Sequence, residues 1–271
     1  MRRIMEQSSP ITGRLNRPPR IFLILLFLFL FGIGSAHSAP SEQNFPFDVG
    51  EKLTYRVSWE GIAVGRATIE VLPGNGYKNV PSYHFIMRTT TNDRVNWFYR
   101  VREIQESYTD RHMTRTLAYV KSDTGTHPRN IRVGFDWDRM EATYQNGGEK
   151  RRCVTIIPGT FDPLSFLFVM RTKDLKTGRV IDIPITDGKK LIRSRASVLR
   201  KERISAGGKS YDAFLVMPAP GQLGNALGRK DAQNLMVWFG DDEKKRPVKI
   251  VTRFAVGRFV FELIPEETTR S

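Results

Sequence analysis

The chain has 271 residues, a formal net charge of +15 and a single cysteine, Cys153. This length is sufficient to bury a hydrophobic core without covalent cross-links, and a single cysteine excludes an intramolecular disulfide. The positive charge favours anionic surfaces such as membrane headgroups and acidic glycans as partners. Nucleic acid is not expected as a partner because the sequence contains no recognisable nucleic-acid-binding motif, and no cofactor is expected.

Residues 1–38 have the three parts of a secretory signal peptide. Five arginines come first, the charge-free apolar run Ile21–Phe31 follows, and small residues end the segment. Cleavage after Ser38 removes five Arg and one Glu, which leaves a net charge of +11 and a flexible start at 39–46. The alternative is an uncleaved inner-membrane anchor, because residues 21–38 carry no charge at all.

Alternation of apolar and polar residues predicts β-strands through most of the remaining chain. From Leu53 to Trp59 every second residue is apolar, so one face of this strand is expected to lie on a core. Glu60-Gly61 interrupts the pattern, and Pro-Gly-Asn-Gly at 73–76 provides the turn after the second strand. Further strands are predicted at 67–71, 83–87, 117–120, 133–137 and 140–144.

The segment from Phe161 to Arg171 does not alternate. Asp162 is a favoured N-cap and Pro163 suits the first helical position, while Arg171 interacts favourably with the C-terminal end of a helix dipole. We therefore predict a short helix at 163–171, buried because it is apolar nearly all round, which closes the open end or seam of the sheet. The alternative for this segment is a buried strand, since Phe and Val also favour strands.

The C-terminal part of the chain returns to strand-like patterns. Strands are predicted at 180–185, 196–199, 211–217, 235–239, 248–251 and 259–263. In total, about eleven to thirteen short strands at close spacing are typical of a β-sandwich or barrel. Because no repeat of fixed period and no long linker divides the chain, we expect one domain at 47–264 and a C-terminal tail at 265–271.

Three histidines follow residue 38, and their spacing does not indicate a site. His84, His112 and His127 have no ligand spacing to one another or to the cysteine, so no metal site is expected. His84 lies on the polar face of its predicted strand. A general base at His84 would need Ser107 and Asp110 as partners, but no nucleophile elbow or ordered triad is present. We expect a solvent-facing histidine and no catalytic residue.

Three further features have simple structural interpretations. The acidic run 241–243 lacks the spacing of an EF-hand, and the cations at 244–246 would repel a calcium ion. The glycine-rich segment 221–228 indicates a loop and lacks the Lys-Ser/Thr ending of a phosphate-binding loop. Cys153 is expected to be a small buried hydrophobe, because alternation places Arg152 outside and the cysteine inside.

Two groups of side chains are candidates for binding. The candidate anion-contacting surface consists of Lys189, Lys190, Arg193, Arg195, Arg200 and Lys201. The candidate apolar lining of a ligand site consists of Trp59, Trp97, Phe98, Tyr99 and Trp137. Arg193 and Arg195 share one face of a predicted strand, which would present both to an anion. The alternatives are charge that serves solubility alone and aromatics that pack an ordinary β core.

Three segments, taken in order, resemble one bacterial family. The segments are Gly50-Glu51-Lys52-Leu53-Thr54-Tyr55 with Gly65, Asp162-Pro163-Leu164-Ser165 with Met170-Arg171, and Trp238-Phe239-Gly240-Asp241-Asp242 with Arg246-Pro247-Val248-Lys249-Ile250. Together they resemble the exported proteins of the domain of unknown function DUF3108 over about residues 47–263. The resemblance implies a mainly β protein of the cell envelope, built as a single open or spiral antiparallel barrel, with no established catalytic residues. With the predicted signal, it implies the periplasm of a Gram-negative bacterium.

These patterns favour a non-enzymatic envelope protein. We expect the concave apolar interior of the barrel to hold a lipid-like or other hydrophobic ligand, and the basic rim to contact anionic envelope components or a membrane surface. The shape is similar to that of periplasmic lipoprotein and lipid carriers with half-open barrels. One alternative is a structural or assembly partner that binds an envelope protein through exposed strand edges. Another is a hydrolase of envelope polymers.

Overall fold

The structure is a computed structural model of the chain. It describes residues 44–265, except for 75, 98, 150, 219–233 and 255–256. The predicted signal peptide, the glycine-rich loop and most of the flexible start and C-terminal tail lie outside the described residues. In the part of the chain that is described, no helix is long and apolar enough to span a membrane.

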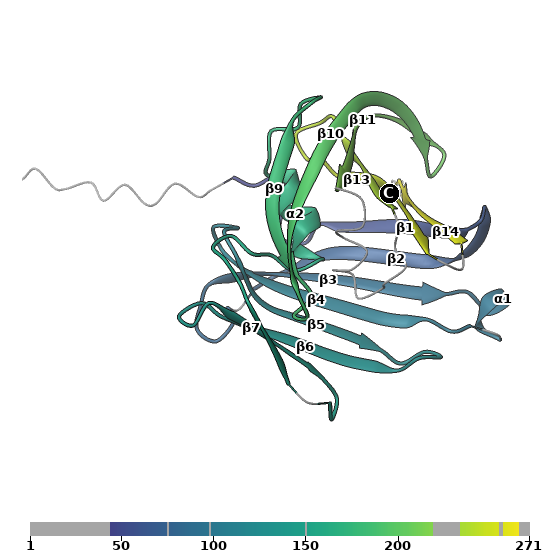
Figure 1. The fold of residues 1–271 in the computed structure, drawn as a ribbon. Coiled ribbons are helices and arrows are strands. Elements are labelled where there is room, and N and C mark those ends of the chain that lie inside the picture. Colours follow the sequence, from purple (N-terminus) through teal and green to yellow (C-terminus); the bar gives the residue numbers. More distant parts are fainter. Residues whose placement is uncertain are drawn as a thin grey trace, which may run out of the picture. The chain divides into compact units, whose positions relative to one another are not determined.

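Fourteen strands of the described chain form one continuous antiparallel sheet (Figure 1). The N-terminal half contributes β1 (Lys52–Trp59), β2 (Ile62–Leu72), β3 (Ser82–Thr91), β4 (Arg102–Asp110), β5 (Thr116–Asp123), β6 (Arg129–Asp136), β7 (Glu141–Asn146) and β8 (Arg152–Thr155). The C-terminal half contributes β9 (Val180–Thr186), β10 (Leu191–Ala206), β11 (Lys209–Pro218), β12 (Asn234–Gly240), β13 (Pro247–Phe254) and β14 (Gly257–Ile264). Within each half, consecutive strands are neighbours, and the pairing of β1 with β14 joins the halves.

The sheet is open, because its two edge strands, β8 and β9, do not pair with each other. These two strands follow each other in the chain. The connection between them carries the helix α2 (Ser165–Arg171), whose residues are almost all buried. The turn after β9 packs against the inner side of β6 and β7. Gly188 in this turn has φ +84°, and a side chain there would collide with Val133 and Tyr144, so only glycine fits. The predicted single open antiparallel barrel with one short buried helix is confirmed.

Alternation along the strands separates an inner apolar face from an outer charged face. Leu53, Tyr55 and Val57 of β1 are buried. On the outer face, Glu262 forms ion pairs with Arg56 at 2.8 Å and with Lys249 at 3.2 Å, across three neighbouring strands. Such partly exposed pairs contribute at most about 1 kcal/mol each, so the stability of the sheet depends on its inner face.

Some local predictions differ from the structure. The helix begins at Ser165, two residues later than predicted, after a turn at 163–164. A second, shorter helix, α1 (Asp93–Asn96), precedes the aromatic run at 97–99. The strand predicted at 196–199 is part of the much longer β10, which is irregular between Val198 and Arg200.

The prediction that Cys153 is buried is wrong. Cys153 is exposed, and its Sγ lies 3.7 Å from the hydroxyl of Thr143 on β7. Its neighbour Val154 packs against the core, and Ile156 is buried. The alternation in β8 is therefore out of phase with the prediction by one residue, and a shift of one residue moves every side chain to the opposite face.

Candidate functional site

Helix α2 is fixed at its N-terminal end by the buried carboxylate of Asp162, which is fully inaccessible to solvent. Its Oδ1 accepts hydrogen bonds from the backbone N–H groups of Leu164 at 2.8 Å and Ser165 at 3.1 Å. Its Oδ2 accepts hydrogen bonds from the hydroxyls of Ser107 on β4 and Thr116 on β5. The carboxylate thus satisfies backbone donors at the start of α2 and ties the helix to two strands.

The C-terminal end of α2 is fixed by the guanidinium of Arg171, which is 1% exposed. Its two Nη atoms donate to the two carboxylate oxygens of Glu51 at 2.5 and 2.8 Å. Nη2 also donates to the carbonyl oxygen of Pro46 at 2.6 Å, and Nε donates to that of Lys244 at 2.9 Å. Every nitrogen of this buried cation therefore has an acceptor, as a charge in a protein interior requires.

The three segments that resemble the DUF3108 family meet at Arg171. Glu51 belongs to the first segment, Arg171 ends the second, and Lys244 lies in the turn of the third. The first and third segments are also joined directly, because the hydroxyl of Tyr55 donates to the carbonyl oxygen of Pro247 at 2.8 Å. Burial raises the pKa of Tyr55 far above its ordinary value. These segments build a packed, hydrogen-bonded frame.

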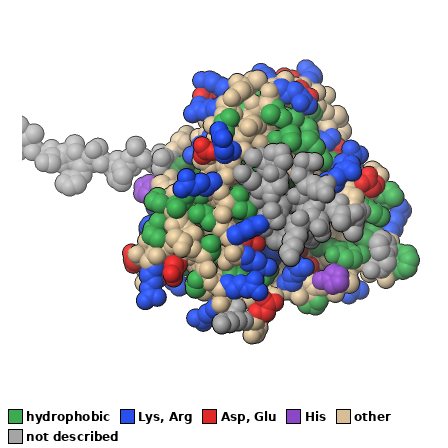
Figure 2. Space-filling model, viewed as in Figure 1, with side chains coloured by type: hydrophobic (Ala, Val, Ile, Leu, Met, Phe, Trp, Pro, Cys, Tyr) green, Lys and Arg blue, Asp and Glu red, His purple; other side chains and the backbone are tan. Residues whose placement is uncertain are grey.

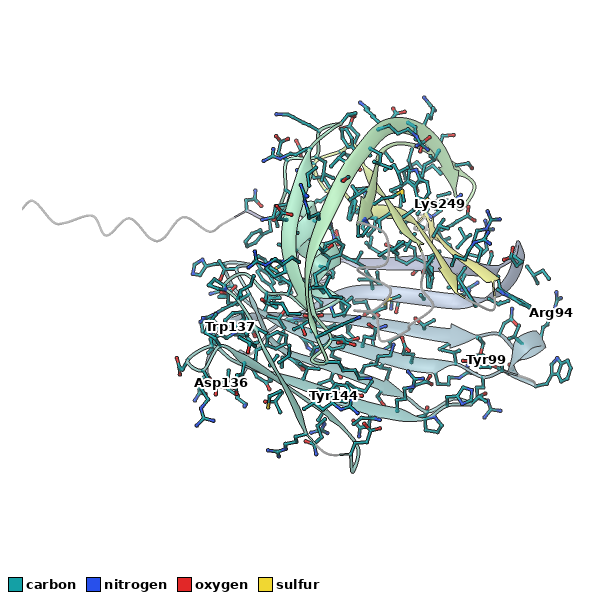
Figure 3. All side chains as sticks on the ribbon, in the orientation of Figure 1. Arg94, Tyr99, Asp136, Trp137, Tyr144 and Lys249 are labelled. Atoms are coloured by element: carbon teal, nitrogen blue, oxygen red, sulfur yellow. The ribbon has the colours of Figure 1, made fainter. Side chains whose placement is uncertain are left out.

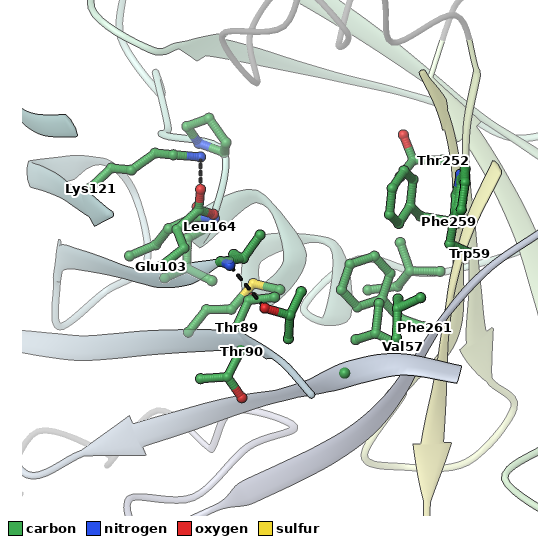
Figure 4. A pocket seen from close by; sticks show the side chains of 18 of the residues that line it. Val57, Trp59, Thr89, Thr90, Glu103, Lys121, Leu164, Thr252, Phe259 and Phe261 are labelled. Carbon is green, nitrogen blue, oxygen red and sulfur yellow. Dashed lines mark hydrogen bonds and ion pairs between the residues drawn. The ribbon is translucent and has the colours of Figure 1, made fainter. Parts of the chain in front are cut away.

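A cavity of about 480 Å³ lies between α2 and the inner face of the sheet (Figure 4). Trp59, Phe259 and Phe261 form an aromatic wall at one end. From the side of the helix, Phe166 and Leu167 contribute apolar surface. Ligand sites of small molecules are typically about 300–1,000 Å³ in volume and mostly apolar. This cavity is therefore the candidate functional site.

The cavity exists because the inner face of the β2–β3 hairpin changes from large to small residues along its length. From the cavity end, the inner cross-strand pairs are Gly65–Thr91, Ala67–Thr89, Ile69–Met87 and Val71–Phe85. The first two pairs are small, so they leave space below α2. The last two pairs are large and extend the packed core. At Gly65 a side chain would collide with the carbonyl oxygen of Thr90 on the next strand, 2.1 Å from the position of Cβ.

The end of the cavity opposite the aromatic wall carries charge (Figure 4). Lys121 and Glu103 form an ion pair there at 2.7 Å, with side chains only 12% and 10% exposed. Gln105 donates to Glu103 at 2.6 Å and accepts a hydrogen bond from the hydroxyl of Tyr119 at 2.8 Å. The cavity therefore combines an aromatic end with a charged end, an arrangement that suits an amphiphilic ligand.

The aromatic residues predicted as a lining do not come together. Trp59 and Tyr99 line the cavity, whereas Trp97 is 83% exposed and Phe98 lies outside the described residues. Trp137 is far from Tyr99, at the opposite end of the strands (Figure 3). There its indole N–H donates to the carbonyl oxygen of Thr116 at 2.9 Å. Trp97 and Trp137 are therefore not part of the lining of this cavity, because neighbouring positions in sequence or shared chemistry do not place side chains on one face.

The basic residues predicted as one anion-contacting surface, Lys189, Lys190, Arg193, Arg195, Arg200 and Lys201, are all exposed. They are spread along β10 and the turn before it. Arg195 pairs with Asp182, Arg200 with Glu202, and Lys201 with Asp241, while Lys189 lies 4.7 Å from the ring centroid of Tyr144. On the face seen in Figure 2, Lys and Arg side chains are scattered and do not form one block. These contacts describe a solvated strand face with local ion pairs.

The groups needed for a catalytic site at His84 lie on opposite faces of the sheet. The Nε2 of His84 lies 2.8 Å from a carboxylate oxygen of Glu106, and its ring stacks on Tyr108 at 4.3 Å on the outer face. Ser107, between these two partners in β4, points inward to Asp162. The described residues also contain no group of three or more His, Cys, Asp or Glu side chains that could hold a metal ion.

The charged end of the cavity was missed by the sequence analysis because β4 reverses the usual pattern. Its inward residues Glu103, Gln105 and Ser107 are polar, whereas Ile104 on the outer face is 39% exposed. Alternation alone would assign the polar residues to solvent. A strand whose polar face turns inward breaks a local rule of folding, and such breaks concentrate at functional sites.

One protein family matches this chain, and solved structures resemble it. The family described as "Protein of unknown function (DUF3108)" matches residues 54–264. A β-barrel-like protein of the domain of unknown function DUF1849 from Brucella abortus is similar in structure, with a TM-score of 0.50 and 8% identity over 80% of this chain and 96% of that chain. The hypothetical protein CT021 from Chlamydia trachomatis has a TM-score of 0.33 and 10% identity over 80% and 86%. No curated protein matches. The Brucella structure supports the barrel-like fold alone.

Proposed function

We propose that this chain, which belongs to the DUF3108 family, binds an amphiphile whose apolar part fills the cavity beside α2. The observation that carries the proposal is the cavity itself, about 480 Å³ with an apolar wall of Trp59, Phe259 and Phe261. Water gains few hydrogen bonds against this apolar wall. An apolar ligand gains about 25 cal/mol for each Å² of apolar surface removed from water. Ligand binding is therefore the favourable way to fill it.

The proposed function is that of a carrier or binding protein of the cell envelope and not that of an enzyme. The groups that a hydrolase would use do not meet at the cavity, because His84 faces outward and the hydroxyl of Ser107 is bound to Asp162. The signal-like pattern of residues 1–38 supports export to the periplasm. The positive charge of the chain supports contact with anionic envelope surfaces.

Binding through strand edges is a weaker account of the same structure. The exposed edge β8 has only four residues and begins with Arg152. Short edge strands with charged residues are features that protect a sheet against pairing with another chain. This edge therefore offers little surface for a partner strand, and the other edge, β9, is already bridged at Ile185 by Phe161. The cavity, in contrast, is large enough for a small molecule.

The test is a titration of the purified protein with a fluorescent fatty acid in detergent-free buffer. The variant Thr89→Phe places a ring in the cavity, because Thr89 lines it opposite Ala67. The matched control Thr54→Phe places the same ring on the outer face of β1. We expect saturable binding to the wild type and to Thr54→Phe, and binding at least about tenfold weaker to Thr89→Phe, a loss of about 1.4 kcal/mol.

Thermal unfolding of both variants checks that they fold. Failure of the wild type to bind would overturn the proposal. Equal affinity of folded Thr89→Phe and the wild type would overturn the assignment of the ligand to this cavity.

A further inference from the structure

We propose that the ligand of this cavity is an acidic amphiphile, whose carboxylate or phosphate head binds the ammonium of Lys121 while its tail extends toward Trp59 and Phe259. This inference rests on the proposed function and adds to it the chemical class of the head group. It is drawn from the charged end of the cavity, where Lys121 and Glu103 are both on the inner face of the sheet.

The first argument is the hydrogen-bonding capacity of Lys121. An ammonium group has three donors, and within the described residues Lys121 forms one ion pair, with Glu103 at 2.7 Å. Two donors can therefore serve a ligand in the cavity. Arg171 is the contrasting case, since its three nitrogens all donate to Glu51 or to backbone carbonyl oxygens. A cation in the wall of a cavity that has donors left over is suited to an acceptor that enters from outside.

The second argument is that Glu103 already has donors for both of its oxygens. Oε2 faces Lys121 at 2.7 Å, and Oε1 accepts from Gln105 at 2.6 Å. The pair can therefore take a further acceptor at Lys121. An anion on the far side of the ammonium lies closer to Lys121 than to Glu103, so attraction exceeds repulsion. Hydrogen bonds between ionised groups are also stronger than those between neutral groups.

The third argument is the origin of the charged end in the sequence. Glu103, Gln105 and Ser107 occupy successive inward positions of β4. A polar residue is needed at Ser107 because its hydroxyl binds Asp162, ahead of helix α2. Glu103 and Gln105 are explained by the cavity, because with Tyr119 they form a hydrogen-bonded series that holds the carboxylate beside Lys121. Burying an ion pair in an apolar interior is costly, so its presence in the cavity wall points to a ligand that uses it.

The experiment measures displacement of a bound fluorescent fatty acid by lauric acid, lauryl phosphate and lauryl alcohol, which share one tail and differ in the head. We expect the wild type to bind at least one of the two acids at least about tenfold more tightly than the alcohol, because hydrogen bonds to charged groups contribute more than those to neutral groups. Comparison of lauric acid with lauryl phosphate identifies the preferred oxyanion.

The inner variant combines Lys121→Met with Glu103→Gln, so that no unpaired carboxylate stays buried. The matched outer variant combines Lys52→Met with Glu70→Gln, an ion pair at 3.5 Å on the outer face. We expect the inner variant to lose the preference for acids while it still binds the alcohol. The outer variant should keep the preference.

The outcomes separate the two proposals. Equal affinity of the wild type for both acids and the alcohol would overturn the acidic head group and leave the proposed function intact. A preference for acids that persists in the inner variant would overturn the role of Lys121. Failure of all three compounds to bind the wild type would overturn the proposed function itself. The comparison of acids and alcohol in the wild type needs no variant, so it holds even if the inner variant does not fold.

Discussion

The inner face of the sheet has a packed region and a hollow region, and neighbouring residues of α2 face each of them. Phe168 stacks on Phe85 with ring centroids 3.8 Å apart, and Arg171 lies in the same packed region. Leu167, one residue earlier than Phe168, lines the cavity. The partners on β2 and β3 decide the difference, since they are large below Phe168 and small beside the cavity. The packed region therefore holds the helix in place, and the hollow region is available for a ligand.

A large loss of stability is expected at Arg171. The variant Arg171→Met leaves Glu51 without its cation and removes the donors of two backbone carbonyl groups. Breaking a buried pair in this way costs about 3–5 kcal/mol. The control is Arg179→Met, whose pair with Asp174 is half exposed on both sides and should cost at most about 1 kcal/mol. Urea unfolding measures both values, and equal losses would show that the Arg171 cluster does not hold the packed region together.

A pair of neighbouring alanine variants compares the two regions directly. Phe168→Ala opens a void in the packed region and should reduce the free energy of unfolding by about 3–5 kcal/mol. Leu167→Ala enlarges a space that already exists, so its cost should be about 1–2 kcal/mol, the lost burial of three carbon groups on a side chain that is only partly buried. Urea unfolding again provides the measurement. A larger loss for Leu167→Ala than for Phe168→Ala would contradict the division into packed and hollow regions.

A smaller, pH-dependent effect is expected at Asp162. Burial raises the pKa of Asp162, although hydrogen bonds from Ser107 and Ser165 act in the opposite direction. A carboxyl group with a raised pKa in the folded state stabilises the fold fully below its unfolded pKa, and this contribution is lost as the pH rises through the folded pKa. The difference in free energy of unfolding between wild type and Asp162→Asn should therefore shrink as the pH rises through that range.

Asp174→Asn is the control for this pH dependence. The hydrogen bond from Lys176 lowers the pKa of Asp174, which is exposed. A lowered pKa gives the opposite sign, so any difference from the wild type should grow as the pH rises through the folded pKa and be complete above the unfolded pKa. Unfolding curves at several pH values test both variants, and a difference for Asp162→Asn that grows with pH would contradict the direction assigned to its pKa.

The sheet and its helix could be predicted from the sequence, because each depends on local patterns. Strict alternation from Leu53 to Trp59 identifies a strand with one buried face. Asp162 and Pro163 ahead of an apolar run indicate a buried helix. Alternation indicates which face of a strand is buried only where the polar residues face solvent. It therefore failed at Cys153, where the apolar residues Val154 and Ile156 were the better guide.

The cavity could be predicted only in part, because it depends on contacts between distant segments. The small residues Gly65 and Thr89 become neighbours of the cavity through strand pairing, which no local pattern contains. Trp59 was found because apolar and polar residues alternate in the sequence of its strand. Glu103 and Lys121 were missed because a polar residue on an inner face looks the same in sequence as one on an outer face.

The most direct test of the central claim is native mass spectrometry of the protein purified without detergent after expression of the whole chain. We predict a bound amphiphile in the wild type and in Thr54→Phe, and its absence in Thr89→Phe, in which the added ring occupies the cavity. A wild-type protein that carries no amphiphile, and takes up none when a fatty acid is added, would contradict the claim that the hollow region of the inner face binds a ligand.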